Sequence, residues 1–188
     1  RFMIPLLRYA DANSDGIIST AELQRGDTAV YVGESTPPRS QVLTSVVGLF
    51  NQRLRLSALV ERRSGFTQLN RLASDQCRVG RCQAGVDPAT PLADQATAAA
   101  LTLSDYFLIE PGDFTRFREL SIAVDIPSSV ARALGMGTAA LTLQGRNLAL
   151  WTRYGGADPE SAAVTTTGAQ EYGIPQGRSW ALRFDVGF

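Results

Sequence analysis

Apolar and polar residues alternate with a period of two in three segments of the chain. These segments are Leu54 to Glu61, Arg118 to Ile126 and Ser179 to Phe188. In the last segment the apolar positions are Trp180, Leu182, Phe184, Val186 and Phe188. Because successive side chains of a strand point to opposite faces, each segment predicts a β-strand with one apolar and one polar face.

Two further strands are expected at Gln41 to Phe50 and Thr138 to Trp151, where the alternation is less regular. Part of another strand is expected before Asp11. These segments together predict an all-β chain.

The connections between the expected strands alternate in length. Phe50 to Arg53 is a short turn, and Pro127 to Gly137 is a compact one with room for a helical turn that ends at Gly135. Long connections run from Gly65 to Asp113 and from Tyr154 to Ile174. An outer-membrane β-barrel has short periplasmic turns and long extracellular loops, whereas a soluble β-sandwich keeps most connections short.

This alternation favours the barrel over the sandwich. We therefore expect an antiparallel meander of about five to six strands, forming the C-terminal segment of a transmembrane β-barrel. Arg183 and Asp185 would then face the polar lumen, opposite the lipid-facing side chains of the same strand. Each strand taken alone also fits a half-buried strand of a soluble domain.

Composition excludes several classes of function. The 188 residues include 18 basic and 18 acidic side chains, so no basic surface for nucleic acid is expected. The chain has no His, which excludes Ser-His-Asp and Cys-His catalysis and every His-dependent zinc site. Asp158 and Glu160 are the kind of carboxylates that surface loops commonly carry, so we do not expect an enzyme.

No signal peptide follows Arg1, so we expect that it was removed or that the chain begins within a longer protein.

Cys77 and Cys82 lie close together in a polar segment. They predict a local disulfide and an oxidising compartment, and the alternative is a pair of free thiols.

The segment from Asp11 to Glu22 has the spacing of an EF-hand calcium loop. The candidate Ca²⁺ ligands are Asp11, Asn13, Asp15, the carbonyl of Ile17, Ser19 and Glu22. Gly16 occupies the position at which such a loop turns sharply. The alternative is a metal-free turn, because Asp, Asn, Ser and Gly also form tight turns. Pro5 argues against a helix entering the loop, so we expect an ion that braces the loop and does not act as a sensor.

Four motifs in sequence order resemble the C-terminal barrel region of SusC-like (SusC/RagA-type) TonB-dependent transporters. They are Tyr9 to Gly16 followed by Ser35 to Pro38, Gly112 to Ser121, Gly145 to Tyr154 with Asp158-Pro-Glu160, and Gly173 to Arg178 before the last strand. Ser14 replaces a glycine of the family pattern, and Ala149 and Leu150 replace a pair that contains an aromatic residue.

The resemblance implies that residues 1–188 are the C-terminal part of a barrel domain whose plug and N-terminal strands are absent. It implies active nutrient import, of oligosaccharides or peptides, across the outer membrane. The implied partners are TonB, acting through the missing region, a SusD-like surface lipoprotein, outer-membrane lipid and the barrel-assembly machinery. Phe188 matches the terminal aromatic residue that this machinery recognises. No cofactor is required, and Ca²⁺ is the single candidate. The alternative function is a secreted, calcium-binding, β-rich adhesion or scaffold module.

Overall fold

A computed structural model describes residues 1–103, 108–161, 163–164, 170–171 and 174–188. The chain divides into two compact units, each of which is described by itself. The first unit comprises Arg1–Pro38, Ser64–Asp113 and Arg153–Pro175, and the second comprises Arg39–Arg63, Phe114–Thr152 and Gln176–Phe188.

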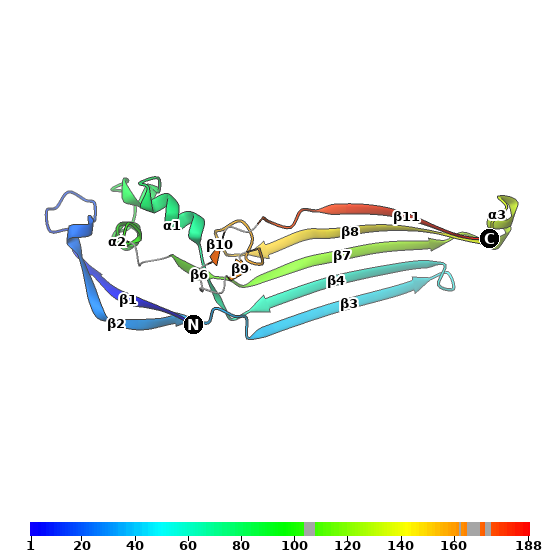
Figure 1. Ribbon diagram of the computed structural model, residues 1–188, viewed down its shortest axis with the longest axis horizontal. Coiled ribbons are helices and arrows are strands. Elements are labelled where there is room, and N and C mark those ends of the chain that lie inside the picture. Colours follow the sequence, from blue (N-terminus) through cyan, green and yellow to red (C-terminus); the bar gives the residue numbers. More distant parts are fainter. Residues whose placement is uncertain (104–107, 162, 165–169, 172–173) are drawn as a thin grey trace. The chain divides into compact units, whose positions relative to one another are not determined.

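The second unit is a five-stranded sheet with the strand order β11-β8-β7-β4-β3. The strands are β3 (Arg39–Leu49), β4 (Leu54–Ser64), β7 (Phe114–Asp125), β8 (Thr138–Thr152) and β11 (Ser179–Gly187). The pairs β11–β8, β8–β7 and β7–β4 are antiparallel, and Figure 1 shows the five strands side by side with β3 and β11 at the edges. The order in the sheet follows the order in the chain, which confirms the expected meander.

Both short connections have the expected compactness. Between β3 and β4 the backbone turns through Phe50, Asn51 and Gln52, which all have positive φ, and the Arg53 N–H donates to the Phe50 carbonyl at 3.3 Å. Between β7 and β8 lies the single-turn helix α3 (Ser128–Ala133), followed by Gly135 at φ 75. Glycine adopts this left-handed conformation without a steric penalty, so it ends the helix as predicted.

The long connection from Gly65 to Asp113 contains elements that the pattern of apolar and polar residues did not predict. They are β5 (Thr67–Leu69), α1 (Arg71–Arg78), η2 (Gln83–Gly85), α2 (Leu92–Leu101) and β6 (Ile109–Pro111). Asn70 caps α1 by accepting a hydrogen bond from the Ala73 N–H at 3.0 Å. Ala-rich composition favours α2, which begins directly after Pro91. Residues 104–107 lie outside the described residues.

The first unit also contains an antiparallel pair, β1 (Phe2–Tyr9) and β2 (Leu23–Gly33), with η1 (Thr20–Glu22) before β2. The partial strand expected before Asp11 is β1. Strand β2 was missed because Gly26 and Asp27, residue types that are depleted in strands, interrupt its alternation. Two short strands, β9 (Ala163–Val164) and β10 (Gln170–Glu171), pair in the second long connection. Much of that connection, at 162, 165–169 and 172–173, lies outside the described residues.

Ala100 and Leu101 form the centre of the first unit's apolar core. The residues packed against them are Ile4, Leu7, Leu23, Cys77 and Leu108. This core therefore joins the β1–β2 pair to both helices. Among the described residues, no helix has the length and apolar character needed to cross a membrane.

Candidate functional site

Four strands of the sheet share one continuous apolar face. Residues directly opposite each other in antiparallel strands project to the same face, so the pairing register defines rows across the sheet. One row consists of Leu182, Leu143, Ile122 and Leu56, and the next consists of Phe184, Leu141, Val124 and Leu54. Leu182 is 70% exposed and Phe184 is 54% exposed. A large exposed apolar face is the mark of a surface that contacts lipid or a partner.

The extent of this apolar belt matches a lipid bilayer. In β7 it runs from Phe117, opposite Ala149, to Val124, opposite Leu141. At about 3.3 Å per residue this distance is about 23 Å. The outward apolar band of a transmembrane barrel is about 25 Å tall.

The opposite face of the sheet is polar and carries paired charges. Arg55 forms a bidentate ion pair with Asp125, with Nη1–Oδ2 and Nη2–Oδ1 distances of 2.5 and 2.7 Å. Arg183 Nη2 lies 2.7 Å from an oxygen of Asp185. This arrangement agrees with the expected position of Arg183 and Asp185 on the polar face. The Arg55 pair was missed because it joins residues 70 apart in sequence and depends on the register of β4 against β7.

Glu61 is the centre of a second charged cluster on the polar face. It accepts hydrogen bonds from Arg118 Nε and, at 2.7 Å, from Arg63 Nε. Arg63 and Arg116 each place the guanidinium carbon 5.8 Å from the centre of the Phe114 ring. Glu61 and Arg116 are buried, at 8% and 2% exposed. Arg63 and Arg118 thus provide Glu61 with two counter-charges, as a carboxylate withdrawn from water requires.

The predicted calcium loop folds around its own carboxylates. Asp11 accepts hydrogen bonds from the N–H groups of Asp15 and Gly16 at 3.2 and 3.0 Å. Asp15 accepts from the Ile17 N–H at 2.8 Å and from Asn13 Nδ2 at 2.8 Å. The structure thus brings Asp11, Asn13 and Asp15 together in a tight turn. Within the part of the chain that the structure describes, no group of three or more His, Cys, Asp or Glu residues is close enough to hold a metal ion.

Glu22 closes this loop from its far end. Its Oε1 accepts the Ala12 N–H at 2.9 Å, and its Oε2 accepts the N–H and the hydroxyl of Ser19 at 2.9 and 2.8 Å. The hydrogen bonds from the Ser19 backbone and side chain lower the pKa of Glu22. The carboxylate therefore stays ionised at neutral pH, in the form that a cation requires.

Ser14, which stands where the SusC-like pattern has a glycine, adopts a left-handed backbone conformation. Its φ is 59, in the left-handed region that favours glycine. Gly16, two residues later, also has a positive φ, of 81, and glycine adopts this conformation without strain.

Gln95 of α2 fastens the loop to the helical part of the first unit. This side chain is 1% exposed. Its Oε1 accepts the Ile18 N–H at 2.8 Å, while its Nε2 donates to the carbonyls of Gly16 and Thr90 at 3.1 and 2.8 Å. No local pattern predicts this role, because Gln95 lies 77 residues from Ile18.

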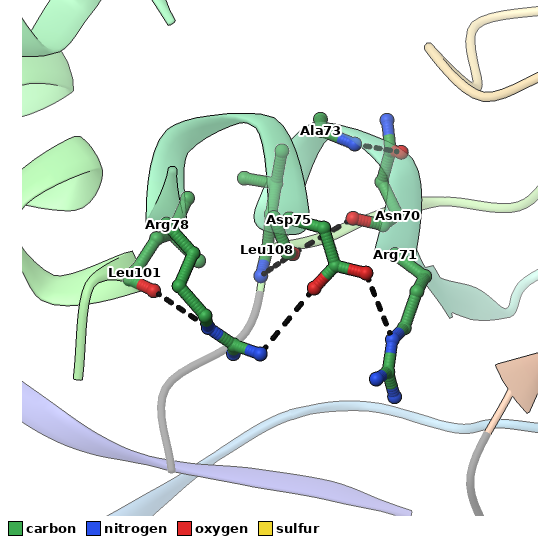
Figure 2. A network of polar contacts seen from close by, with 8 residues as sticks. Asn70, Arg71, Ala73, Asp75, Arg78, Leu101 and Leu108 are labelled. Carbon is green, nitrogen blue, oxygen red and sulfur yellow. Dashed lines mark hydrogen bonds and ion pairs between the residues drawn. The ribbon is translucent and has the colours of Figure 1, made fainter. Parts of the chain in front are cut away.

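A polar network holds α1 against the end of α2 (Figure 2). Asp75 accepts from Arg71 Nε at 3.2 Å and from Arg78 Nη1 at 3.3 Å. Arg78 Nε also donates to the Leu101 carbonyl at 3.4 Å. In this way the C-terminus of α2, whose last carbonyls lack partners within the helix, receives a cationic donor.

Polar contacts, two of them partly buried, hold the motif around Tyr154. The Tyr154 hydroxyl donates to the Leu69 carbonyl at 2.9 Å, and Glu110 accepts from the Gly155 N–H at 2.8 Å and from Asn70 Nδ2 at 3.1 Å. Burial, reinforced by the charge of Glu110, raises the pKa of Tyr154 to about 12. The hydroxyl therefore remains a donor across the physiological pH range.

Cys77, in the last turn of α1, forms a disulfide with Cys82, and their Cα atoms are 4.6 Å apart. Cys77 also packs against the core of Ala100 and Leu101. The disulfide therefore ties the end of α1 to the segment that leads into η2.

Replacing Cys82 by Ser should loosen this region. Opening so short a loop removes about 2 kcal/mol of loop-closure stabilisation. We expect faster amide exchange in α1 of the intact protein, with the long strands unchanged. Peptide mapping without reductant should find Cys77 and Cys82 linked in the parent protein, and thiol labelling of both residues there would contradict the disulfide.

The fold defined by these features is that of a segment of β-barrel wall. Comparisons with protein-family models and with curated proteins find no match. Among solved structures, the chain is similar to a chain of the RagAB peptide importer in its open-open state, with a TM-score of 0.64 and 17% identity over 99% of this chain.

Two further solved structures have the same fold. The chain matches the RagAB peptide importer in its closed-closed state with a TM-score of 0.59 and 20% identity, and a RagAB peptide transporter structure with 0.60 and 18%. Each of these two alignments covers 85% of this chain. The chain spans 20–22% of the length of the chains that it matches.

Proposed function

We propose that this chain is part of the barrel wall of a SusC-like outer-membrane transporter that imports peptides and draws its energy from TonB. The observation that carries the proposal is the apolar belt, which crosses four strands and lies opposite a polar face with internally paired charges. A bilayer-spanning wall needs this combination, since one face meets lipid and the other lines a polar interior. The likeness to RagAB favours peptides over oligosaccharides as cargo.

The same proposal assigns the remaining parts of the chain. The three segments of the first unit, which together include α1, α2 and the Asp11–Glu22 loop, join the sheet at the starts of β3, β7 and β11 and at the ends of β4 and β8. All five positions lie at one end of an antiparallel sheet. In this proposal the three segments form the extracellular side of the transporter, where a SusD-like lipoprotein binds. The short turns face the periplasm. TonB acts through a part of the protein outside this chain.

The test is uptake by cells that lack the complete gene. Labelled oligopeptides should enter cells carrying the full-length gene and should fail to enter the deletion strain. Collapse of the proton-motive force should abolish this uptake, and labelled oligosaccharides serve as the cargo control. Recovery of the protein in the culture medium instead of the outer-membrane fraction would support the secreted adhesion module and overturn the transporter.

The Asp11–Glu22 loop is proposed to take up Ca²⁺ as a structural ion. Its support is the spacing of six oxygen ligands and the ionised state of Glu22, whose pKa is lowered. Binding would require Glu22 to exchange some of its N–H partners for the ion. Phe188, fully exposed after β11, is likewise proposed as the contact for the barrel-assembly machinery.

Limited proteolysis of the intact transporter tests the calcium proposal. Chelation should raise the rate of cleavage between Asp11 and Glu22 and leave the strands intact, because their hydrogen bonds do not involve the ion. The protease should cleave the loop of the Asp15→Ala variant rapidly with or without calcium. The Asp27→Ala variant, changed in β2 outside the loop, should be cleaved as the parent protein is. If the parent protein is cleaved at the same rate with and without millimolar calcium, the loop is a metal-free turn and the calcium proposal is wrong.

A further inference from the structure

One charged residue breaks the apolar face of the sheet at the end where the long connections begin. Arg62, Thr115 and Trp151 lie directly opposite one another in β4, β7 and β8, so they form a single row. The preceding row on the same face is Val60, Phe117 and Ala149. Arg62 therefore projects from the apolar face, at its very edge.

Burial supports this assignment independently of the register. The neighbouring row, which points to the polar face, contains Glu61 and Arg116, at 8% and 2% exposed. In contrast, Arg62 is exposed and Trp151 is 57% exposed. The two consecutive arginines at the end of β4 therefore lie in different environments. Arg63 forms an ion pair with Glu61, whereas Arg62 lies on the apolar face.

Among the described residues of β4, β7, β8 and β11, no acidic side chain lies on the face that carries Arg62. Among the paired positions of β4, β7, β8 and β11, it is the single charged residue on that side. Its guanidinium makes no hydrogen bond or ion pair with the described residues. Arginine presents donors in a planar fork that fits phosphate oxygens, and aromatic residues such as Trp151 occupy the boundary between hydrocarbon and headgroups.

We propose that Arg62, with Thr115 and Trp151, forms a docking point for the phosphate of a membrane lipid headgroup in the outer leaflet. This inference rests on the proposed function, because it requires the apolar belt to lie in a bilayer. The acyl chains would cover Val60, Phe117 and Ala149, while the phosphate would accept hydrogen bonds from Arg62 and the Thr115 hydroxyl. Facing Cβ atoms in such a row are about 5 Å apart, which allows one phosphate to contact both side chains.

Native mass spectrometry of the full-length transporter tests this docking point. The probe is a glucosamine-disaccharide lipid carrying two phosphates, compared with its dephosphorylated form in the same detergent. The parent protein should retain the phosphorylated lipid about tenfold better than Arg62→Gln does, the size of one charge-assisted hydrogen bond. Arg62→Lys should be intermediate, because an ammonium group lacks the planar fork.

Arg53→Gln is the matched control, since it removes the same charge from an exposed residue just before the other end of β4. Retention equal to that of the parent is expected. Equal retention of the dephosphorylated lipid, an equal loss in Arg53→Gln, or displacement of the lipid by millimolar inorganic phosphate would each overturn the docking point. Cell fractionation distinguishes failure of the docking point from failure of the proposed transporter function. If the parent protein is absent from the outer-membrane fraction, the transporter function itself is refuted.

Discussion

Ile122→Arg is expected to destabilise the barrel by about 2–4 kcal/mol, the cost of an arginine at the centre of a lipid-facing strand. Ile122 occupies the middle of the apolar belt, between Leu143 and Leu56. Ser121→Arg places the same side chain one residue away on the polar face, beside Gln144 and Ser57. This change should alter the free energy of unfolding by about 0.5 kcal/mol or less. Urea unfolding of the full-length transporter in bilayers measures both values.

A second measurement separates lipid contact from burial in a soluble core, because arginine at position 122 would destabilise either structure. A fluorescent label on Ile122→Cys should be quenched by lipids with brominated acyl chains. The same label on Ser121→Cys should not be quenched. Quenching at neither position, together with a severe loss of stability in Ile122→Arg, would identify the apolar belt as the interior of a soluble β-domain.

The strands of the sheet were predictable because their side chains carry the signal directly. Where one face meets an apolar environment and the other a polar one, the period-two pattern marks the strand and its two faces at once. The segments around Leu56, Ile122 and Leu182 therefore lie in β4, β7 and β11 as expected. Strand β2 lacks this contrast, since most of its side chains are exposed whichever way they point.

The side-chain contacts that hold the Asp11–Glu22 loop and the polar face of the sheet were less predictable, because they join residues far apart in sequence. The EF-hand spacing identified the ends of the Asp11–Glu22 loop, yet it gave no sign of Gln95, which holds the loop from α2. Likewise, Glu61 and Arg118 are found together only when the register of β4 against β7 is known. The helices themselves had local signals, namely the Asn70 cap and the Ala-rich run after Pro91.

Gln95→Leu is expected to release the Asp11–Glu22 loop from α2. The substitution keeps a side chain of similar size but leaves the buried Ile18 N–H and the carbonyls of Gly16 and Thr90 without their partner. Each buried polar group left unsatisfied costs about 1–3 kcal/mol. Loss of about 3 kcal/mol of local stability corresponds to roughly 100-fold faster amide exchange at Ile18. Hydrogen exchange of the intact transporter, in the presence of chelator, measures this change without a contribution from calcium.

Two variants separate the hydrogen bonds of Gln95 from its packing. Gln95→Glu keeps an oxygen for the Ile18 N–H but loses the two donors, so Ile18 should remain protected while the turn at Gly16 exchanges faster. Gln24→Leu, at an exposed position of β2, should leave exchange throughout the loop unchanged. Unaltered exchange at Ile18 in Gln95→Leu would mean that the loop is held by its own carboxylates. In that case Asp11 and Glu22, which accept N–H groups from both ends of the loop, would be sufficient to fix it.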